Sequence, residues 1–399
     1  MAGQTGSTEG LVPVARPVIG DEEIAAAVRV LRSGSVVQGP EVAAFEREFA
    51  DLVDGRECVA VNSGTSALHL ALLALGIGPG DEVVVPSFSF AATANAVRLA
   101  GAEPVFADIE PGSFGLDPAA AAAAIGPRTA ALLPVHLYGH PAAMGELGRL
   151  AERHGLAVVE DACQAHGAAL GSTAAGALGA AGCFSFYPTK NMHALEGGMV
   201  TVADPAVARQ LRLLRNQGME QRYRNEIVGA NLRMTDVSAA IGRVQLRRLP
   251  AANERRRAHA ALLDRELAGL AAAGLVTPVV TAGARHVYHQ YTVRVLGGRR
   301  DRLRRELAAA GVDSEVYYPV PIHRLPPFQG WWELPETDRA AAEVLSLPVH
   351  PTLTERELAR VAEAVRSALG AWGAQGDLGA PGDLDTAGRA DGAVPSAVA

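Results

Sequence analysis

The chain has 399 residues, of which 49% are hydrophobic and 20% are charged, and its formal net charge is −7 at pH 7. At roughly 150 residues per domain, this length and apolar content suit two or three domains with real cores and exclude a mostly disordered chain. The acidic balance argues against a general binder of nucleic acid or of membrane surfaces, because both partners are negatively charged.

The termini and the cysteines indicate a protein of the reducing interior of the cell. The N-terminus lacks the basic region and apolar core of a signal peptide. The three cysteines Cys58, Cys163 and Cys183 form no set that implies a disulfide framework. We therefore predict a soluble, cytoplasmic protein, with a flexible tail at 1–12 and a disordered tail rich in Gly, Ala, Asp and Pro at 373–399.

Seven short apolar runs predict buried strands. They span 57–64, 81–87, 102–109, 129–135, 156–161, 182–187 and 197–202. Helical stretches lie between them, and two of the runs restart at the spacing that a strand, a crossover helix and two loops require. The pattern predicts an α/β fold whose mostly parallel, seven-stranded sheet carries helices on both faces.

After about residue 203 the sequence pattern changes and predicts long, Arg-rich helices. One of them should span 236–249, with Asp236 as its N-cap and Pro250 after its end. Helices then mix with isolated strands, at 289–295 and 313–320. We therefore expect a large α/β domain over 13–250 and a smaller α+β domain over 251–372.

Two of the predicted strands end next to a stretch without charge. Residues 162–189 contain no Asp, Glu, Lys or Arg, and Asp161 and Lys190 border them. The five glycines and the proline of this stretch exclude a lipid-facing helix. A carboxylate at the end of a buried strand needs a cationic or N–H partner, and a protonated pyridine nitrogen would serve, although Asp161 could equally cap the next helix.

Lys190 is the only lysine of the chain. In weakly charged surroundings its pKa falls and its amine becomes nucleophilic toward a carbonyl, whereas arginine cannot form a Schiff base. The alternative is a solvated loop lysine. A third strand end, at 62–66, offers small hydroxyl residues that either bind a phosphate or merely cap a helix. A phosphate cradle, a pyridinium carboxylate and a Schiff-base lysine are what pyridoxal phosphate requires.

Eight segments together resemble the DegT/DnrJ/StrS aminotransferases, which are fold-type I pyridoxal-phosphate enzymes. They are VNSGTSALHLAL, VPSFSFAATANA, PVHLYGHP, VEDACQAHGA, CFSFYPTKNMHALEGGMV, RNQGMEQRY, GANLRMTDVSAAIGRVQL and HVYHQYTVRV, in order between Pro13 and Leu369. The resemblance implies a cofactor, pyridoxal 5′-phosphate, and a catalytic pair, in which Lys190 forms the Schiff base and Asp161 pairs with the pyridinium nitrogen. It implies these other cofactor contacts: Thr65, Ser66 and Ser185 at the phosphate, Phe90 stacked on the ring, Gln164 at the ring's other face or hydroxyl, and Asn231 at the phosphate of the neighbouring subunit in a homodimer.

The function implied by the resemblance is transfer of an amino group from glutamate or glutamine to a keto-sugar, nucleotide-linked in most of the family, in the biosynthesis of amino sugars or secondary metabolites. Relatives that act as sugar dehydratases carry histidine in place of the lysine, so Lys190 favours transamination. Two alternatives stay open: a keto-cyclitol as the substrate, and a non-catalytic binding or regulatory protein.

Histidine and tyrosine side chains elsewhere enter no predicted site. His136 and His140, and His286 and His289, have close spacings, but a glycine breaks the first segment, so we predict no metal and favour hydrogen-bonded loop histidines. Tyr317, Tyr318 and His323 could line a sugar site, or could pack in the core beside two prolines.

Overall fold

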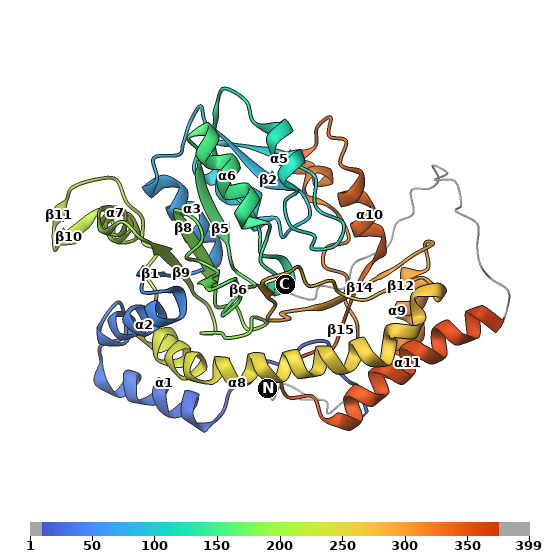
Figure 1. The fold of residues 1–399 in the computed structure, drawn as a ribbon. Coiled ribbons are helices and arrows are strands. Elements are labelled where there is room, and N and C mark those ends of the chain that lie inside the picture. Colours follow the sequence, from blue (N-terminus) through green and yellow to red (C-terminus); the bar gives the residue numbers. More distant parts are fainter. Residues whose placement is uncertain (1–9, 375–399) are drawn as a thin grey trace.

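The computed structural model describes residues 10–374, and a seven-stranded sheet lies at its centre (Figure 1). Its order is β1-β9-β8-β5-β4-β2-β3. The bounds are β1 Glu57–Val61, β2 Glu82–Pro86, β3 Glu103–Ala107, β4 Thr129–Leu132, β5 Ala157–Asp161, β8 Ala181–Ser185 and β9 Gly198–Val202. Only β9 pairs antiparallel, with β1 and β8. The seven predicted strands and the mostly parallel α/β fold are confirmed.

Helices cover both faces of this sheet (Figure 1). One face packs against α3 (Gly64–Ala74), α4 (Ala92–Leu99) and α7 (Pro205–Arg215), and the other against α2 (Pro40–Ala50), α5 (Pro118–Ala124) and α6 (Met144–His154). Strand β1 shows why both faces are apolar. Val59 and Val61 enter the first core and Cys58 and Ala60 the second, because successive side chains of a strand point to opposite faces.

Helix α8 (Asp236–Leu267) runs beneath both the sheet and the C-terminal part of the chain (Figure 1). The prediction that this helix ends at residue 249 is wrong, because it continues through Pro250. A proline inside a helix costs about 3 kcal/mol. Leu249 is buried in the core of the large sheet and Leu263 in that of the C-terminal part, and this burial on both sides offsets the cost. The predicted domain boundary at 250 falls inside the helix and stays a prediction.

The N-terminus of α8 differs from the prediction as well. Thr235 is the N-cap, and its side chain accepts a hydrogen bond from the Ser238 N–H at 3.1 Å. Asp236 is instead the first helical residue, and its Oδ1 accepts the N–H groups of Gly39 at 2.7 Å and Val42 at 3.2 Å. Asp236 therefore caps α2, which begins 196 residues earlier at Pro40. No local sequence pattern predicts this contact.

The C-terminal part contains a three-stranded antiparallel sheet of β12 (Leu275–Val276), β14 (Tyr291–Val295) and β15 (Val344–Leu347). The predicted strand at 289–295 is confirmed as β14. The predicted strand at 313–320 is wrong: only Glu315 pairs, in an isolated bridge with Ser346, because Pro319 and the proline at 321 lack the N–H of a ladder.

The remaining elements are shorter or peripheral. They are α1 (Asp21–Ser33), α9 (Arg300–Ala309), α10 (Pro335–Glu343), α11 (Glu355–Ala374), β6 (Ala169–Leu170), β7 (Thr173–Ala174), β10 (Met219–Gln221), β11 (Arg224–Asn225) and β13 (Ala284–Arg285). Of the predicted tails, residues 1–9 and 375–399 lie outside the described residues. Among the helices of residues 10–374, none is both long and apolar enough to cross a membrane.

Candidate active site

Asp161 ends strand β5 with a buried carboxylate, 5% exposed. Its Oδ2 accepts the Thr93 hydroxyl at 2.8 Å, and its Oδ1 accepts the Cys163 N–H at 3.2 Å. Thr93 in turn shares a hydrogen bond of 2.9 Å with Ser89. An ionised carboxylate has about four acceptor positions, so Asp161 keeps capacity for a further, cationic donor.

Lys190 lies in the loop that follows β8, the strand that pairs with β5. Its side chain is partly buried, and burial lowers its pKa from the ordinary lysine value, while the nearby Cys163 and Asp161 oppose that shift. A lysine with a lowered pKa carries a larger fraction of neutral, nucleophilic amine. The structure thus brings the two ends of the uncharged stretch into one electrostatic environment.

The three predicted phosphate-binding hydroxyls come together at the start of α3. Thr65 and Ser66 lie in its first turn, and Ser63 caps the helix by accepting the Ser66 N–H at 3.1 Å. Ser185, at the end of β8, packs so close to Gly64 that a Cβ on this glycine would lie 2.7 Å from the Ser185 Cβ. Backbone N–H groups and hydroxyls at the start of a helix form a cradle of the kind that binds phosphate.

Gln164 links the loop after β5 to the C-terminal part of the chain. Its Oε1 accepts the Tyr138 N–H at 2.8 Å, and its Nε2 donates to the Tyr318 hydroxyl at 3.1 Å. The Tyr318 ring lies 5.8 Å from that of Phe90, whose side chain is 50% exposed. Tyr318 therefore belongs to the group that Phe90 and Gln164 form. The sequence contained it in YYPVPIH but offered nothing that separates it from a packing residue.

Asn231 is exposed, on the segment that precedes α8. This segment lies beside the end of β1, where the Asn62 N–H donates to the Leu232 carbonyl at 3.0 Å. An exposed side chain at this place is free to reach a neighbouring molecule.

The histidines have structural partners. His136 is fully buried, accepts the Ala142 N–H through Nδ1 at 3.0 Å and contacts Glu160 through Nε2 at 2.9 Å. His140 contacts the Pro141 carbonyl at 2.7 Å, and His323 contacts the Ser87 hydroxyl at 2.7 Å. Across residues 10–374 no group of three His, Cys, Asp or Glu side chains could hold a metal ion.

Comparison with known proteins gives a family match over most of the chain. The profile of the DegT/DnrJ/EryC1/StrS aminotransferase family matches residues 17–366. A relative from Streptomyces venezuelae, dTDP-3-amino-3,4,6-trideoxy-alpha-D-glucose transaminase, is 47% identical over 350 residues, which are 86% of this chain and 91% of the relative.

Solved structures share the fold over nearly their whole length. DesV of S. venezuelae, in complex with a ketimine intermediate, is 44% identical with a TM-score of 0.86, over 90% of this chain and 99% of DesV. NtdA of Bacillus subtilis, with its cofactor PMP bound, is 32% identical with a TM-score of 0.85, over 92% of this chain and 87% of NtdA.

Proposed function

The chain belongs to the DegT/DnrJ/EryC1/StrS aminotransferase family and is a pyridoxal-phosphate-dependent aminotransferase, and we propose that it aminates the keto group of a nucleotide-linked sugar. The amino group comes from an amino acid, glutamate or glutamine. The proposed substrate class rests on the S. venezuelae relative, whose name identifies a dTDP-linked amino sugar. The product would enter amino-sugar or antibiotic biosynthesis.

The observation that carries this proposal is the placement of Asp161 and Lys190, the only lysine of the chain, at the ends of two paired strands, within electrostatic reach of one another. The residues present fit pyridoxal phosphate, because Asp161 has unused acceptor capacity in a buried place, which suits a protonated ring nitrogen. Thr65, Ser66 and Ser185 would hold the phosphate, and Phe90 and Gln164 would contact the ring. When bound, this cofactor supplies an electron sink that stabilises negative charge on carbon.

Each side chain has a distinct task in the proposed reaction. Lys190 binds the cofactor covalently through Nζ and, once the amino donor has displaced it, moves a proton as general base and then as general acid. Asp161 holds the positive charge on the ring nitrogen throughout. Because burial lowers the Lys190 pKa, a larger fraction of the freed amine is neutral and able to accept that proton.

We also propose that the enzyme acts in the cytoplasm as a homodimer with shared active sites. Helix α1 supports a dimer, because Ile24, Val28 and Leu31 lie on one face of it, 54%, 37% and 62% exposed, and a contiguous apolar face favours a protein partner. Asn231 would reach the phosphate of the partner's cofactor. The free thiols of Cys58, Cys163 and Cys183 suit a reducing compartment.

The test is a screen of nucleotide-linked keto-sugars and keto-cyclitols with glutamate or glutamine, read by mass spectrometry of the product. The wild-type protein should bind pyridoxal phosphate with an absorbance band that the amino donor bleaches. Lys190→Ala should lose the band and all transamination, and Lys190→Arg, which keeps the charge, should lose them equally. Activity of either variant, or amination of cyclitols alone, would contradict the proposal.

A further inference from the structure

One buried side chain of α8 contacts both loops that carry the proposed catalytic pair. Asn253 is 4% exposed, and its Nδ2 donates to the carbonyl of His166 at 2.8 Å, in the loop that follows Asp161. Its Oδ1 accepts from Nδ2 of Asn191 at 2.9 Å, in the loop that carries Lys190. A single amide thus bridges two loops whose key residues stand 29 positions apart in the sequence.

Asn191, the direct neighbour of Lys190, extends this bridge to a third segment. It is 9% exposed, and its Nδ2 also donates to the Val287 carbonyl at 3.0 Å. Its Oδ1 accepts from Nδ1 of His289 at 3.3 Å, because an amide oxygen can only accept. Both hydrogens and the oxygen of the Asn191 amide are therefore engaged, which fixes its orientation.

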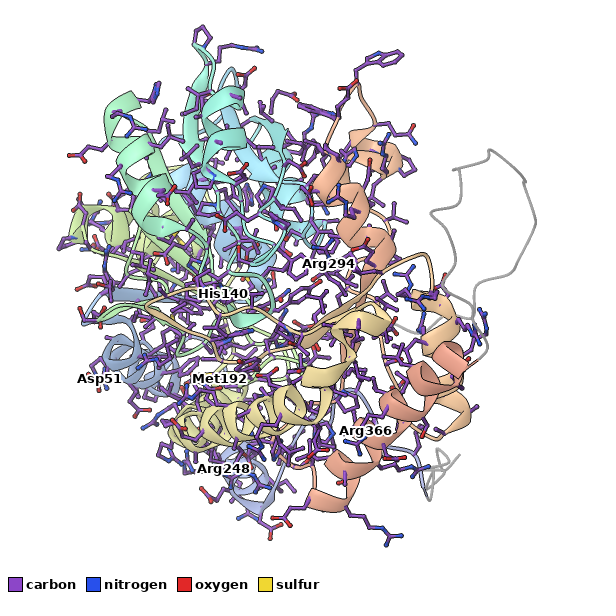
Figure 2. All side chains as sticks on the ribbon, turned by 45° about the vertical axis from the view of Figure 1, so that its right-hand side comes forward. Asp51, His140, Met192, Arg248, Arg294 and Arg366 are labelled. Carbon is purple, nitrogen blue, oxygen red and sulfur yellow. The ribbon has the colours of Figure 1, made fainter. Side chains whose placement is uncertain are left out.

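The close approach of α8 to the Asp161 loop depends on a glycine. Gly167 has a φ of +81°, and a Cβ at this position would lie 2.9 Å from the Asn253 Nδ2. Any other residue would both strain the backbone and push the amide away. Figure 2 shows Met192, two residues beyond Lys190, beside the same helix, and Met192 shares a buried core with Leu249 of α8. The helix therefore packs directly under the Lys190 loop.

The bridge matters for the reaction because the cofactor must be held at two ends at once. A lysine side chain has a long, flexible stem, and its lowered pKa requires that the amine stay in its desolvated position. Misplacement of reacting groups by about 1 Å can cost a factor of 100 in rate. Asp161 and Lys190 share no hydrogen bond among those of the described residues, so their separation depends on what fixes the two loops.

We propose that Asn253 is a positioning residue that, through His166 and Asn191, holds the Asp161 loop and the Lys190 loop at the separation the cofactor requires. The proposal rests on the proposed function only for the identity of the cofactor. It gives α8 a role beyond joining the two parts of the chain. Packing alone would also explain a buried asparagine, so the test must separate stability from the state of Lys190.

The unique lysine makes such a test direct. In cofactor-free protein, the rate of acetylation of Lys190 is followed against pH by peptide mass spectrometry, alongside the melting temperature and the dissociation rate of pyridoxal phosphate from the loaded protein. Asn253→Ala should move the midpoint of Lys190 acetylation upward toward the ordinary lysine pKa of about 10.4. It should also speed cofactor dissociation by about tenfold, the effect of losing one net hydrogen bond.

Gln245→Ala is the matched control. Gln245 is a buried amide of the same helix, and its Nε2 donates at 2.9 Å to the Val18 carbonyl and at 2.7 Å to Glu23, neither of which belongs to the Asp161 loop or the Lys190 loop. This variant should lower the melting temperature but leave the Lys190 midpoint and the cofactor dissociation rate unchanged.

The outcomes separate the proposals. A folded Asn253→Ala protein with the wild-type midpoint and dissociation rate would overturn the positioning role. If that variant does not fold, Asn191→Ala decides, because it removes the contact of Asn253 with the Lys190 loop and keeps its contact with the His166 carbonyl. An unchanged midpoint in Asn191→Ala would overturn the role. Failure of the wild-type protein to bind pyridoxal phosphate would contradict the proposed function. The midpoints of Lys190 acetylation, measured without cofactor, would still test the role of Asn253.

Discussion

The Asp161 carboxylate is buried beside neutral hydrogen-bond donors. Two neutral donors, Thr93 and the Cys163 N–H, contact its carboxylate, and none of the ion pairs among residues 10–374 includes it. A buried carboxylate without a cation is costly, so a bound cation would stabilise both itself and the fold. This is the physical reason to expect the cofactor ring nitrogen there.

We predict that Asp161→Asn lowers kcat/KM by roughly 100-fold or more, because removing one member of a buried charged pair costs about 3–5 kcal/mol. Steady-state kinetics with a saturating amino donor measures this. Thr93→Val is the control: it removes one neutral donor and leaves the charge, so its loss should stay near tenfold. Equal losses in the two variants would show that the charge of Asp161 has no special role.

His166 makes the stability of the protein depend on pH. It is fully buried beside Phe184 and Phe186, and burial lowers its pKa to about 3, with the Lys190 charge adding to the shift. The unfolded chain takes up this proton below about pH 6.5, whereas the folded protein does not until about pH 3. The contribution of His166 to the free energy of unfolding is therefore fully present above pH 6.5. Below that pH it decreases by about 1.4 kcal/mol per pH unit.

We predict that His166→Leu makes the free energy of unfolding less sensitive to acid. Between pH 7 and pH 5 the variant should lose roughly 2 kcal/mol less than the wild-type protein, since one proton is no longer taken up on unfolding. Urea unfolding at the two pH values measures both differences, and the change caused by the substitution itself cancels. The same loss in both proteins would mean that His166 is protonated in the folded state.

The sequence predicted those candidate residues that differ in chemical type from the residues around them. Lys190 is the only lysine and borders an uncharged stretch with Asp161, so composition alone drew attention to both. Tyr318 and Asn253 have no such contrast. Their positions depend on contacts with Gln164 and Asn191, which lie 154 and 62 residues away and which only the folded chain brings close.

At the scale of elements, local patterns predicted strands better than the bounds of helices. Each buried strand is an apolar run between polar loops, which the sequence displays directly. The end of α8 depended on a balance instead: a proline favoured ending at residue 249, and burial of Leu249 and Leu263 on two sides favoured continuing. A local rule cannot weigh burial that distant segments provide.

We predict that Asp236→Ala destabilises the protein by about 1–3 kcal/mol, because it leaves the Gly39 and Val42 N–H groups at the start of α2 without their acceptor. Asp236→Asn should restore most of this loss, since its amide oxygen can accept the same bonds. Thermal unfolding of the two variants measures the difference. If Thr235→Ala cost much more than Asp236→Ala, the cap of α8 rather than that of α2 would dominate.

At the scale of the whole molecule, α8 runs beneath both the sheet that carries the proposed site and the C-terminal part of the chain (Figure 1). Tyr318 comes from that part and contacts Gln164 of the large sheet's loop. Phe90, half exposed, and Asn231, exposed, mark where the chain remains open to another molecule. In a dimer with two-fold symmetry, one subunit's Asn231 would complete the other subunit's site.

This arrangement predicts complementation between two defective variants. Lys190→Ala removes the amine, and Asn231→Asp places a negative charge against the partner's phosphate, so each homodimer should be inactive or nearly so. In a mixed dimer, one site combines both defects, while the other has Lys190 from one subunit and Asn231 from the other. After subunit exchange at equal concentrations, half of the dimers are mixed, so activity should recover to roughly a quarter of the wild-type value. Activity measured before and after exchange, with light scattering to establish the dimer, tests this. If Asn231 acted within its own subunit, every mixture would stay as inactive as its parents.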